Sequence, residues 1–234
     1  MSPIATKATA VTTPTTVNLN AAQIQVQTFT VTLESFRITN TRSRHEDTDY
    51  VTLTVLNKPA SGTGTPQTQK KSMGNLNNGT FKVGLSFPNF HVDPNGSLVF
   101  NYLIVNSGHK SESQIYSVME NAGGSLATKG LTAAGAAIGT AIPIPFLGTL
   151  LGAGAGWLVG EVKSLLSADC DGAVAAEQAT LTYNDLLSRT AKGPFTHETA
   201  HPGTDSAHGC GSNSMYYVTW QIARGAVSGG VTKA

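Results

Sequence analysis

The chain has 234 residues, a formal net charge of +1 at pH 7, and charged side chains at only 12% of its positions. This length is sufficient for one large domain or two small ones. A net charge so close to zero produces no field that would attract nucleic acid, and the basic pair Lys70 and Lys71 has no aromatic residues interleaved with it. We therefore expect no nucleic-acid partner.

Residues 1–21 are rich in Thr, Pro and Ala, which is typical of a flexible N-terminal arm. They contain no apolar stretch of the length that a cleaved signal peptide needs. The sequence therefore predicts a protein that is cytoplasmic, or that leaves the cell by a signal-independent route or by lysis. Action at a membrane stays open in either case.

Residues 22–110 are predicted to form the first β-strands of a sandwich. In 22–39, apolar and polar residues alternate, but the phase slips at 27–28 and again at 34–35. Such slips indicate bulges or a strand that passes from one sheet to another.

Three further strands and one loop follow in this region. Alternation with threonines at 51–55 predicts a half-buried strand, and residues 81–87 alternate most regularly. Residues 97–106 are apolar on both faces and predict a central strand. The Gly/Ser/Thr/Asn-rich stretch 58–79 predicts a long surface loop.

Residues 111–168 are predicted to form a helical insertion. Helical spacing begins at 111–127, with Ser111 or Ser113 as the cap. Residues 130–160 then contain no charged side chain. Two prolines, Pro143 and Pro145, interrupt a single straight helix. We therefore expect a helical hairpin with arms at about 127–141 and 146–167.

The second arm has a glycine at every fourth position, which places these glycines on one face of a helix. A smooth glycine face allows another helix to approach closely. The residues predicted to form this glycine zipper and its apolar surroundings are Gly135, Gly139, Phe146, Leu147, Gly148, Leu151, Gly152, Gly156, Trp157 and Gly160.

The apolar hairpin has two main interpretations. It inserts into a lipid membrane or assembles there with copies of itself, or it lies buried in the monomer or in a homo-oligomeric core. A permanently membrane-spanning protein is a weaker interpretation, because the uncharged part of the second arm is only marginally long enough for a bilayer.

Residues 169–234 are predicted to return to the sheet. Strands are expected at 173–183 and 216–224, a helical turn at 184–191, and an irregular, breaker-rich stretch at 192–214. The predicted fold is mainly β with an α insertion (α+β). It is an antiparallel β-sandwich of about seven strands plus the apolar Gly/Ala-rich helical hairpin.

The two cysteines, Cys170 and Cys210, occupy similar Gly-rich settings at either side of the expected C-terminal strands. A disulfide between them would be stable outside the cytosol. Two free thiols fit the sequence equally well, so both states stay open.

The string His197-Glu198-Thr199-Ala200-His201 matches the H-E-x-x-H pattern of zinc hydrolases. That pattern works when a helix places both histidines on one face. Here Pro194 precedes the string and Pro202 follows it, so a long helix is not supported. A set of His197, His201 and His208, with Cys210, is the looser alternative for zinc binding without catalysis.

Other site chemistry has weaker support. Glu46, Asp47 and Asp49 are a candidate calcium cluster, but no glycine supplies the turn of a known calcium loop, and local ion pairs and turn capping explain them better. No G-x-S-x-G elbow, phosphate-binding loop or cofactor motif is present. The sequence therefore gives enzyme activity no support and predicts no cofactor.

The function that the sequence favours is membrane-active and non-enzymatic, a pore-forming or membrane-inserting, toxin-like protein. Its partners would be a lipid membrane and copies of itself, as a homo-oligomer. The alternative is a soluble structural or binding protein with a buried hairpin. A zinc-dependent hydrolase that uses the HETAH string is the weakest alternative.

Overall fold

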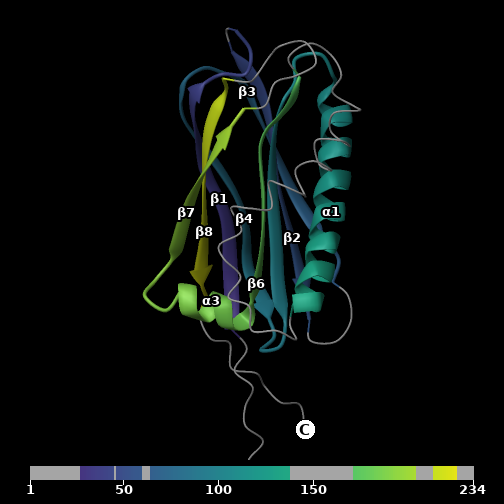
Figure 1. Ribbon diagram of the computed structural model, residues 1–234, viewed down its shortest axis with the longest axis vertical. Coiled ribbons are helices and arrows are strands. Elements are labelled where there is room, and N and C mark those ends of the chain that lie inside the picture. The colour runs from purple at the N-terminus through teal and green to yellow at the C-terminus, as the bar shows by residue number, and fades with distance from the viewer. Residues whose placement is uncertain (1–26, 45, 60–63, 138–170, 204–212, 226–234) are drawn as a thin grey trace, which may run out of the picture.

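The computed structural model describes residues 27–44, 46–59, 64–137, 171–203 and 213–225 (Figure 1). Within these ranges the protein is mainly β, with two antiparallel four-stranded sheets. The first sheet has the order β4-β1-β8-β7, and the second has the order β3-β2-β5-β6. The first sheet contains β1 (Gln27–Asn40), β4 (Gly79–Val92), β7 (Phe195–Pro202) and β8 (Met215–Arg224). The second contains β2 (Asp47–Lys58), β3 (Gln67–Leu76), β5 (Ser97–Asn106) and β6 (Gly172–Thr182).

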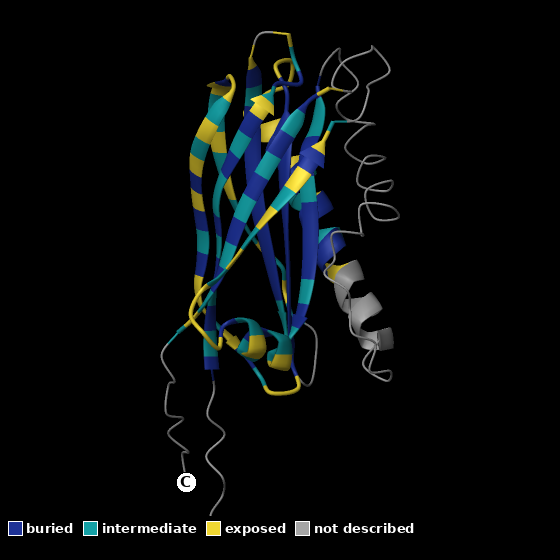
Figure 2. Ribbon diagram, turned by 60° about the vertical axis from the view of Figure 1, so that its left-hand side comes forward, coloured by how far each residue is buried: buried dark blue, intermediate teal, exposed yellow. Residues whose placement is uncertain are grey.

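The two sheets share one hydrophobic core, and we call them together the two-sheet body. Strands of the first sheet alternate between buried and less buried residues, as a sheet with one solvated face does (Figure 2). Their buried residues meet the inward residues of the second sheet in a single cluster. Phe100 of β5, for example, lies edge-to-face against Trp220 of β8 with ring centroids 4.8 Å apart. The C-terminal strands thus complete the first sheet.

Strand β1 contains the irregularity that the sequence pattern predicts at 34–35. Its register shifts between Leu33 and Ser35 in the pairings with both β4 and β8. This shift lets Leu33 and Phe36 both face the core. A second shift, against β4 alone, lies between Phe29 and Val31 rather than at 27–28.

Eight strands lie in the described ranges, and the two that the sequence analysis missed are polar edge strands. The expected surface loop 58–79 contains β3, and the expected irregular stretch 192–214 contains β7. Each pairs with a neighbour on one side only, so its outward residues remain in water and need not be apolar. Lys71 of β3 donates from Nζ to the carbonyls of Lys82 and Val83, and this contact joins β3 to β4.

Helix α1 (Glu112–Ala137) covers the outer face of the second sheet (Figure 1). Its residues Ile115, Met119 and Leu126 are buried against that face. As a result β2 is buried on both faces, so the prediction of a half-buried strand at 51–55 is wrong. The central position of β5, by contrast, is confirmed.

Helix α1 is longer than the helix expected at 111–127 and runs without a break into the expected first arm of the hairpin. It includes Gly135. The end of the predicted first arm, the turn and the second arm lie outside the described residues, and with them Gly139, Phe146, Leu147, Gly148, Leu151, Gly152, Gly156, Trp157 and Gly160. Among the helices that are described, none combines the length and the hydropathy that crossing a membrane requires.

The expected helical turn at 184–191 is present as α3 (Tyr183–Arg189). Thr182 caps it: its Oγ1 accepts from the Asp185 backbone N–H, while the Asp185 side chain accepts from the Thr182 backbone N–H. This reciprocal pair is the capping box that such spacing favours. Thr182 is also the last residue of β6, so the cap ends the strand and starts the helix at one point.

Candidate functional site

The helical insertion leaves and rejoins the two-sheet body at one place. Strand β5 ends at Asn106 and β6 begins at Gly172, and these two residues are paired across the sheet. The chain that follows Asn106 and the chain that precedes Gly172 therefore run side by side. We call residues 107–109 and residue 171 the stems of the insertion.

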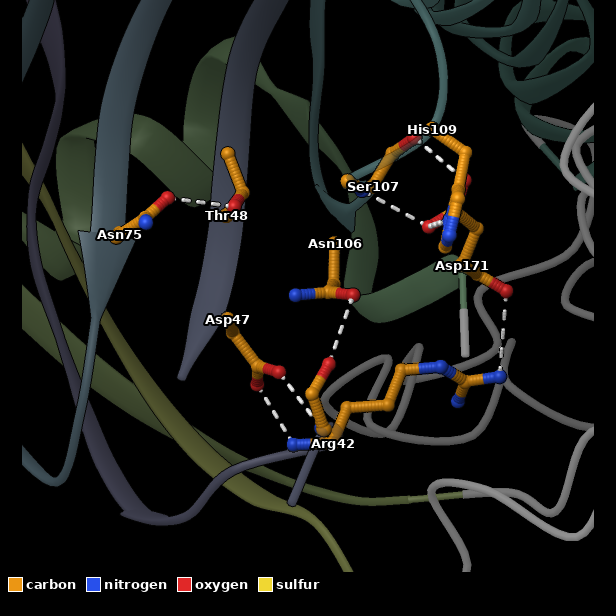
Figure 3. A network of polar contacts seen from close by, with 10 residues as sticks. Arg42, Asp47, Thr48, Asn75, Asn106, Ser107, His109 and Asp171 are labelled. Atoms are coloured by element: carbon orange, nitrogen blue, oxygen red, sulfur yellow. Dashed lines mark hydrogen bonds and ion pairs between the residues drawn. The ribbon is translucent and has the colours of Figure 1, made fainter. Parts of the chain in front are cut away.

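One buried carboxylate joins the two stems (Figure 3). The Asp171 side chain is 2% exposed, and its Oδ2 accepts from Ser107 Oγ at 2.7 Å. Its Oδ1 accepts from the Gly108 backbone N–H at 2.9 Å and lies 3.2 Å from Nδ1 of the half-exposed His109. A charged acceptor with several donors forms strong hydrogen bonds. We call this arrangement the stem clamp.

The loop after β1 contacts the stem clamp through Arg42. Arg42 is buried, and its guanidinium donates from Nη2 to the Asp171 carbonyl at 3.5 Å (Figure 3). The guanidinium also lies directly against Gly172, where a Cβ atom would be 2.9 Å from Nη2. A side chain at residue 172 would require the Arg42 guanidinium to move.

Asp47 fixes that loop from the opposite side. It accepts from the backbone N–H of Arg42 at 2.6 Å and from that of Ser43 at 2.7 Å. It shares the Tyr216 hydroxyl with Asp49, at 2.6 and 2.9 Å. Burial, and then the charge of Asp47, raise the pKa of Asp49 well above its usual range. Asp49 Oδ1 has no hydrogen-bond partner among the described residues.

The acidic residues considered for calcium do not converge. Asp47 and Asp49 point into the body toward Tyr216, whereas Glu46 accepts from Asn75 Nδ2 on β3 at 2.6 Å. Within the part of the chain that the structure describes, no three His, Cys, Asp or Glu side chains could hold a metal ion together. These carboxylates instead position a loop.

The HETAH string lies on a β-strand, β7, and not on the helix that the zinc-hydrolase pattern requires. On β7 the side chains of His197 and His201 face inward, while Glu198 is exposed on the opposite face and lies 3.8 Å from Arg37. Four residues of strand span about 13 Å, too far for the two histidines to share one zinc ion. His208 and the two cysteines, Cys170 and Cys210, lie outside the described residues.

His201 belongs instead to a buried hydrogen-bond network between the sheets. Its Nε2 lies 2.7 Å from the Tyr102 hydroxyl, and that hydroxyl donates to Glu177 Oε2 at 2.7 Å. Thr199 Oγ1 and Trp220 Nε1 donate to the same oxygen at 2.8 and 3.2 Å. Burial lowers the pKa of His201 to about 4, so the ring is neutral at pH 7. We call this the Glu177 network.

The contact between α1 and the second sheet contains polar side chains at its centre. Asn101 donates from Nδ2 to the Gly123 carbonyl at 2.9 Å, and a Cβ at Gly123 would be 2.4 Å from Thr54 Oγ1. Thr52 Oγ1 and Asn101 Oδ1 are buried and have no partner in the described ranges. We call Thr52, Thr54, Asn101 and Gly123 the polar seam. Unpartnered buried polar atoms make a contact weaker than an apolar one of equal area.

Sequence reasoning missed Asp171 and Glu177. Glu177 is the one acidic residue within the apolar strand 172–182, and that position is the signal that could have found it, whereas Asp171 directly precedes the strand in a polar stretch that also contains Asp169. Comparison with known proteins adds no candidate, because no family model and no curated protein matches the chain.

Proposed function

We propose that the protein is membrane-active and non-enzymatic. In this proposal a β-sandwich body carries the uncharged segment 130–160 as a glycine-zipper helical hairpin, which inserts into a lipid bilayer or assembles there with other copies of the chain. The observation that carries the proposal is that run without a charged residue, with glycines at 148, 152, 156 and 160.

The placement of the insertion supports this function. Both sheets are built from residues outside 107–171, and the stems meet at paired residues of one antiparallel ladder. The insertion can therefore change its surroundings without breaking a strand pairing. Asp171 then has a defined role, because it keeps the stems together while the insertion moves.

The polar seam, which lies between α1 and the outer face of the second sheet, also supports this function. A helix that must leave the body needs a contact that is specific but weak. The α1 contact has apolar residues at Ile115 and Met119, and unpartnered polar atoms at Thr52 and Asn101. This mixture lowers the free energy that separation of α1 costs.

A second candidate function has one specific observation in its favour. Ala127, at the start of the expected first arm, is buried against Leu56 and Val99 of the second sheet. Thr128, the next residue of the arm, is exposed, so Ala127 alone makes this buried contact among the arm residues whose side chains the structure describes. This contact favours a structural or binding protein with the apolar segment buried in the monomer or in a homo-oligomeric core.

Dye release from liposomes, with flotation of the same sample, separates the two candidates. A membrane-active protein releases dye and floats with the vesicles. The pair Gly152→Leu and Gly156→Leu should abolish release, because leucine blocks close helix contact. Gly124→Leu is the matched control, since no atom lies within 4 Å of a Cβ at that position of α1. No release and no flotation by the wild-type protein would favour the buried segment.

The variant Asp171→Asn tests the stem clamp. It removes the charge that Ser107, Gly108 and His109 share, so we expect the free energy of unfolding to fall by about 1–3 kcal/mol and dye release to rise. Asp185→Asn is the control, because it weakens the cap of α3, away from the stems. Equal release by both variants would remove the stem clamp from the proposal.

A further inference from the structure

An open cleft of about 430 Å³ lies at the end of the two-sheet body opposite the stems. Strand β2 runs from Asp49, beside Asn106 at the stem end, to Asn57, which lines the cleft. Thr65 and Gln67 lie beside it at the start of β3, and Asn89, Phe90 and His91 belong to the end of β4. Its volume falls in the range of small-molecule sites.

The lining of the cleft is polar but contains no Lys, Arg, Asp or Glu. Gln67 and Asn89 each carry two N–H donors and a carbonyl acceptor, and the Thr65 hydroxyl both donates and accepts. The third carboxamide, of Asn57, already uses one donor on the His91 carbonyl. Such a set matches a ligand whose groups also donate and accept in alternation and carry no charge. Phosphate or carboxylate ligands would lack a cation in this lining.

Two of the lining residues are held in place by contacts outside the cleft. Phe90 packs edge-to-face on Phe87 with ring centroids 5.7 Å apart. Asn57 donates from Nδ2 to the His91 carbonyl, which connects the two sheets, and its buried Oδ1 has no partner among the described residues. A buried acceptor without a partner carries a cost that a ligand hydroxyl or a water molecule would relieve.

Asn89 has a backbone conformation that suits a binding residue. Its φ is 56°, in the left-handed region, and it is the one non-glycine residue with positive φ in the described ranges. Asn tolerates this region better than most residues, but the conformation still carries strain. Asn89 lies within β4, at the register shift of this strand against β1 between Phe29 and Val31, and it is one of the residues that line the cleft.

We propose that this cleft binds a neutral carbohydrate. Sugar hydroxyls both donate and accept, as the carboxamides of Asn57, Gln67 and Asn89 do, and the apolar C–H face of a sugar ring fits the flat rings of Phe90 and His91. The proposal goes beyond the membrane function. Binding at this end would direct one end of the body toward a glycan-bearing surface.

Protein-detected NMR titration with galactose, mannose, glucose and N-acetylglucosamine tests the site, with N-acetylneuraminic acid as a charged probe. We expect a neutral sugar to shift the backbone amides of Thr65, Gln67 and residues 89–91, and the charged sugar to leave them unchanged. Asn89→Gly keeps the positive φ and removes the side chain, and Gln67→Ala removes a second carboxamide. Each should weaken binding about tenfold, the loss that follows from one or two hydrogen bonds.

Asn78→Ala is the matched control, because Asn78 is an exposed carboxamide outside the cleft lining. It should bind like the wild type. The proposal is overturned if no neutral sugar shifts Thr65, Gln67 and residues 89–91, or if Asn89→Gly and Gln67→Ala bind like the wild type. The titration contains no lipid, and the vesicles used for dye release contain no glycolipid. Carbohydrate binding and membrane activity are therefore tested independently.

Discussion

The two faces of the second sheet are both buried but are built differently. The inner face, toward the first sheet, carries Val51, Leu53 and Phe100, and its main polar group, Tyr102, lies in the Glu177 network. The outer face, under α1, carries Thr52 and Asn101, each with a polar atom that has no partner among the described residues. Within the described ranges the inner face also has one unpartnered polar atom, Asp49 Oδ1, but Asp49 accepts from Tyr216 through its other oxygen. We therefore expect the outer contact to be the weaker of the two.

The largest expected effect comes from the inner face. Phe100→Ala removes a fully buried ring that lies against Trp220 and should lower the free energy of unfolding by about 3–5 kcal/mol. Chemical denaturation followed by circular dichroism measures this change. If Phe100→Ala lowered the free energy of unfolding by less than the outer-face variant Gly123→Ala, the inner contact would not be the stronger of the two.

Acid should weaken the inner face through His201. Its folded pKa of about 4 lies below the usual 6.5, so the unfolded chain binds the proton first. The stabilisation is therefore present above about pH 6.5 and is lost as the pH falls toward 4, by up to about 3 kcal/mol. Tyr102, Glu177 and Thr199 belong to the same network.

The control for this acid effect is His201→Phe, which keeps a ring in place but cannot titrate. Thermal unfolding at a series of pH values between 7 and 4 should show a steeper decline for the wild type than for the variant. Asp49 acts in the opposite direction, because its pKa is raised, but it is present in both proteins and cancels in the difference. Parallel pH profiles would show that His201 does not cause the acid loss.

On the outer face, Gly123→Ala should separate α1 from the sheet. The new Cβ would meet Thr54 Oγ1 at 2.4 Å, so the helix must shift, at about 1–3 kcal/mol. Hydrogen exchange should rise in α1 more than in β5. Gly124→Ala, one position along, points into open space and should stabilise α1 by about 0.5–1 kcal/mol. Equal exchange in both variants would mean that the seam is not tightly packed.

The smallest expected effect has the opposite sign. Thr52→Val keeps the shape of a fully buried side chain and removes its unpartnered hydroxyl, so the protein should gain about 1 kcal/mol. Differential scanning calorimetry measures the gain. If separation of α1 precedes membrane insertion, this variant should also release dye more slowly from liposomes. A destabilised variant would indicate that Thr52 has a hydrogen bond after all.

The sequence predicts those parts of the fold in which the hydrophobic pattern of a strand matches the burial of its two faces. In β5 both faces are apolar and both are buried, and in β1 the phase slip marks a register shift between Leu33 and Ser35. Strands β3 and β7 were not predictable, because an edge strand is held by backbone hydrogen bonds that leave no hydrophobic pattern. The full burial of Thr52 depends on α1, which no local pattern shows.

The candidate site was less predictable than the fold. The HETAH string has the right spacing for zinc on a helix, but on β7 the same spacing places Glu198 on the face opposite the histidines. A motif of this kind specifies chemistry only together with its secondary structure. Asp171 acts through Ser107 and Gly108, which are distant in sequence, so only the pairing of β5 with β6 brings the stem clamp together.

The pairing of Asn106 with Gly172 also has a consequence for how the chain can change length. Residues 107–171 form a loop with both ends fixed at one place, and the entropy of closing such a loop grows only with the logarithm of its length. Doubling the loop costs about 0.6 kcal/mol. The loop entropy is thus nearly insensitive to the number of residues between the end of α1 and Asp171, so we expect that part of the segment to tolerate changes in length while α1 stays packed and β5 and β6 stay paired.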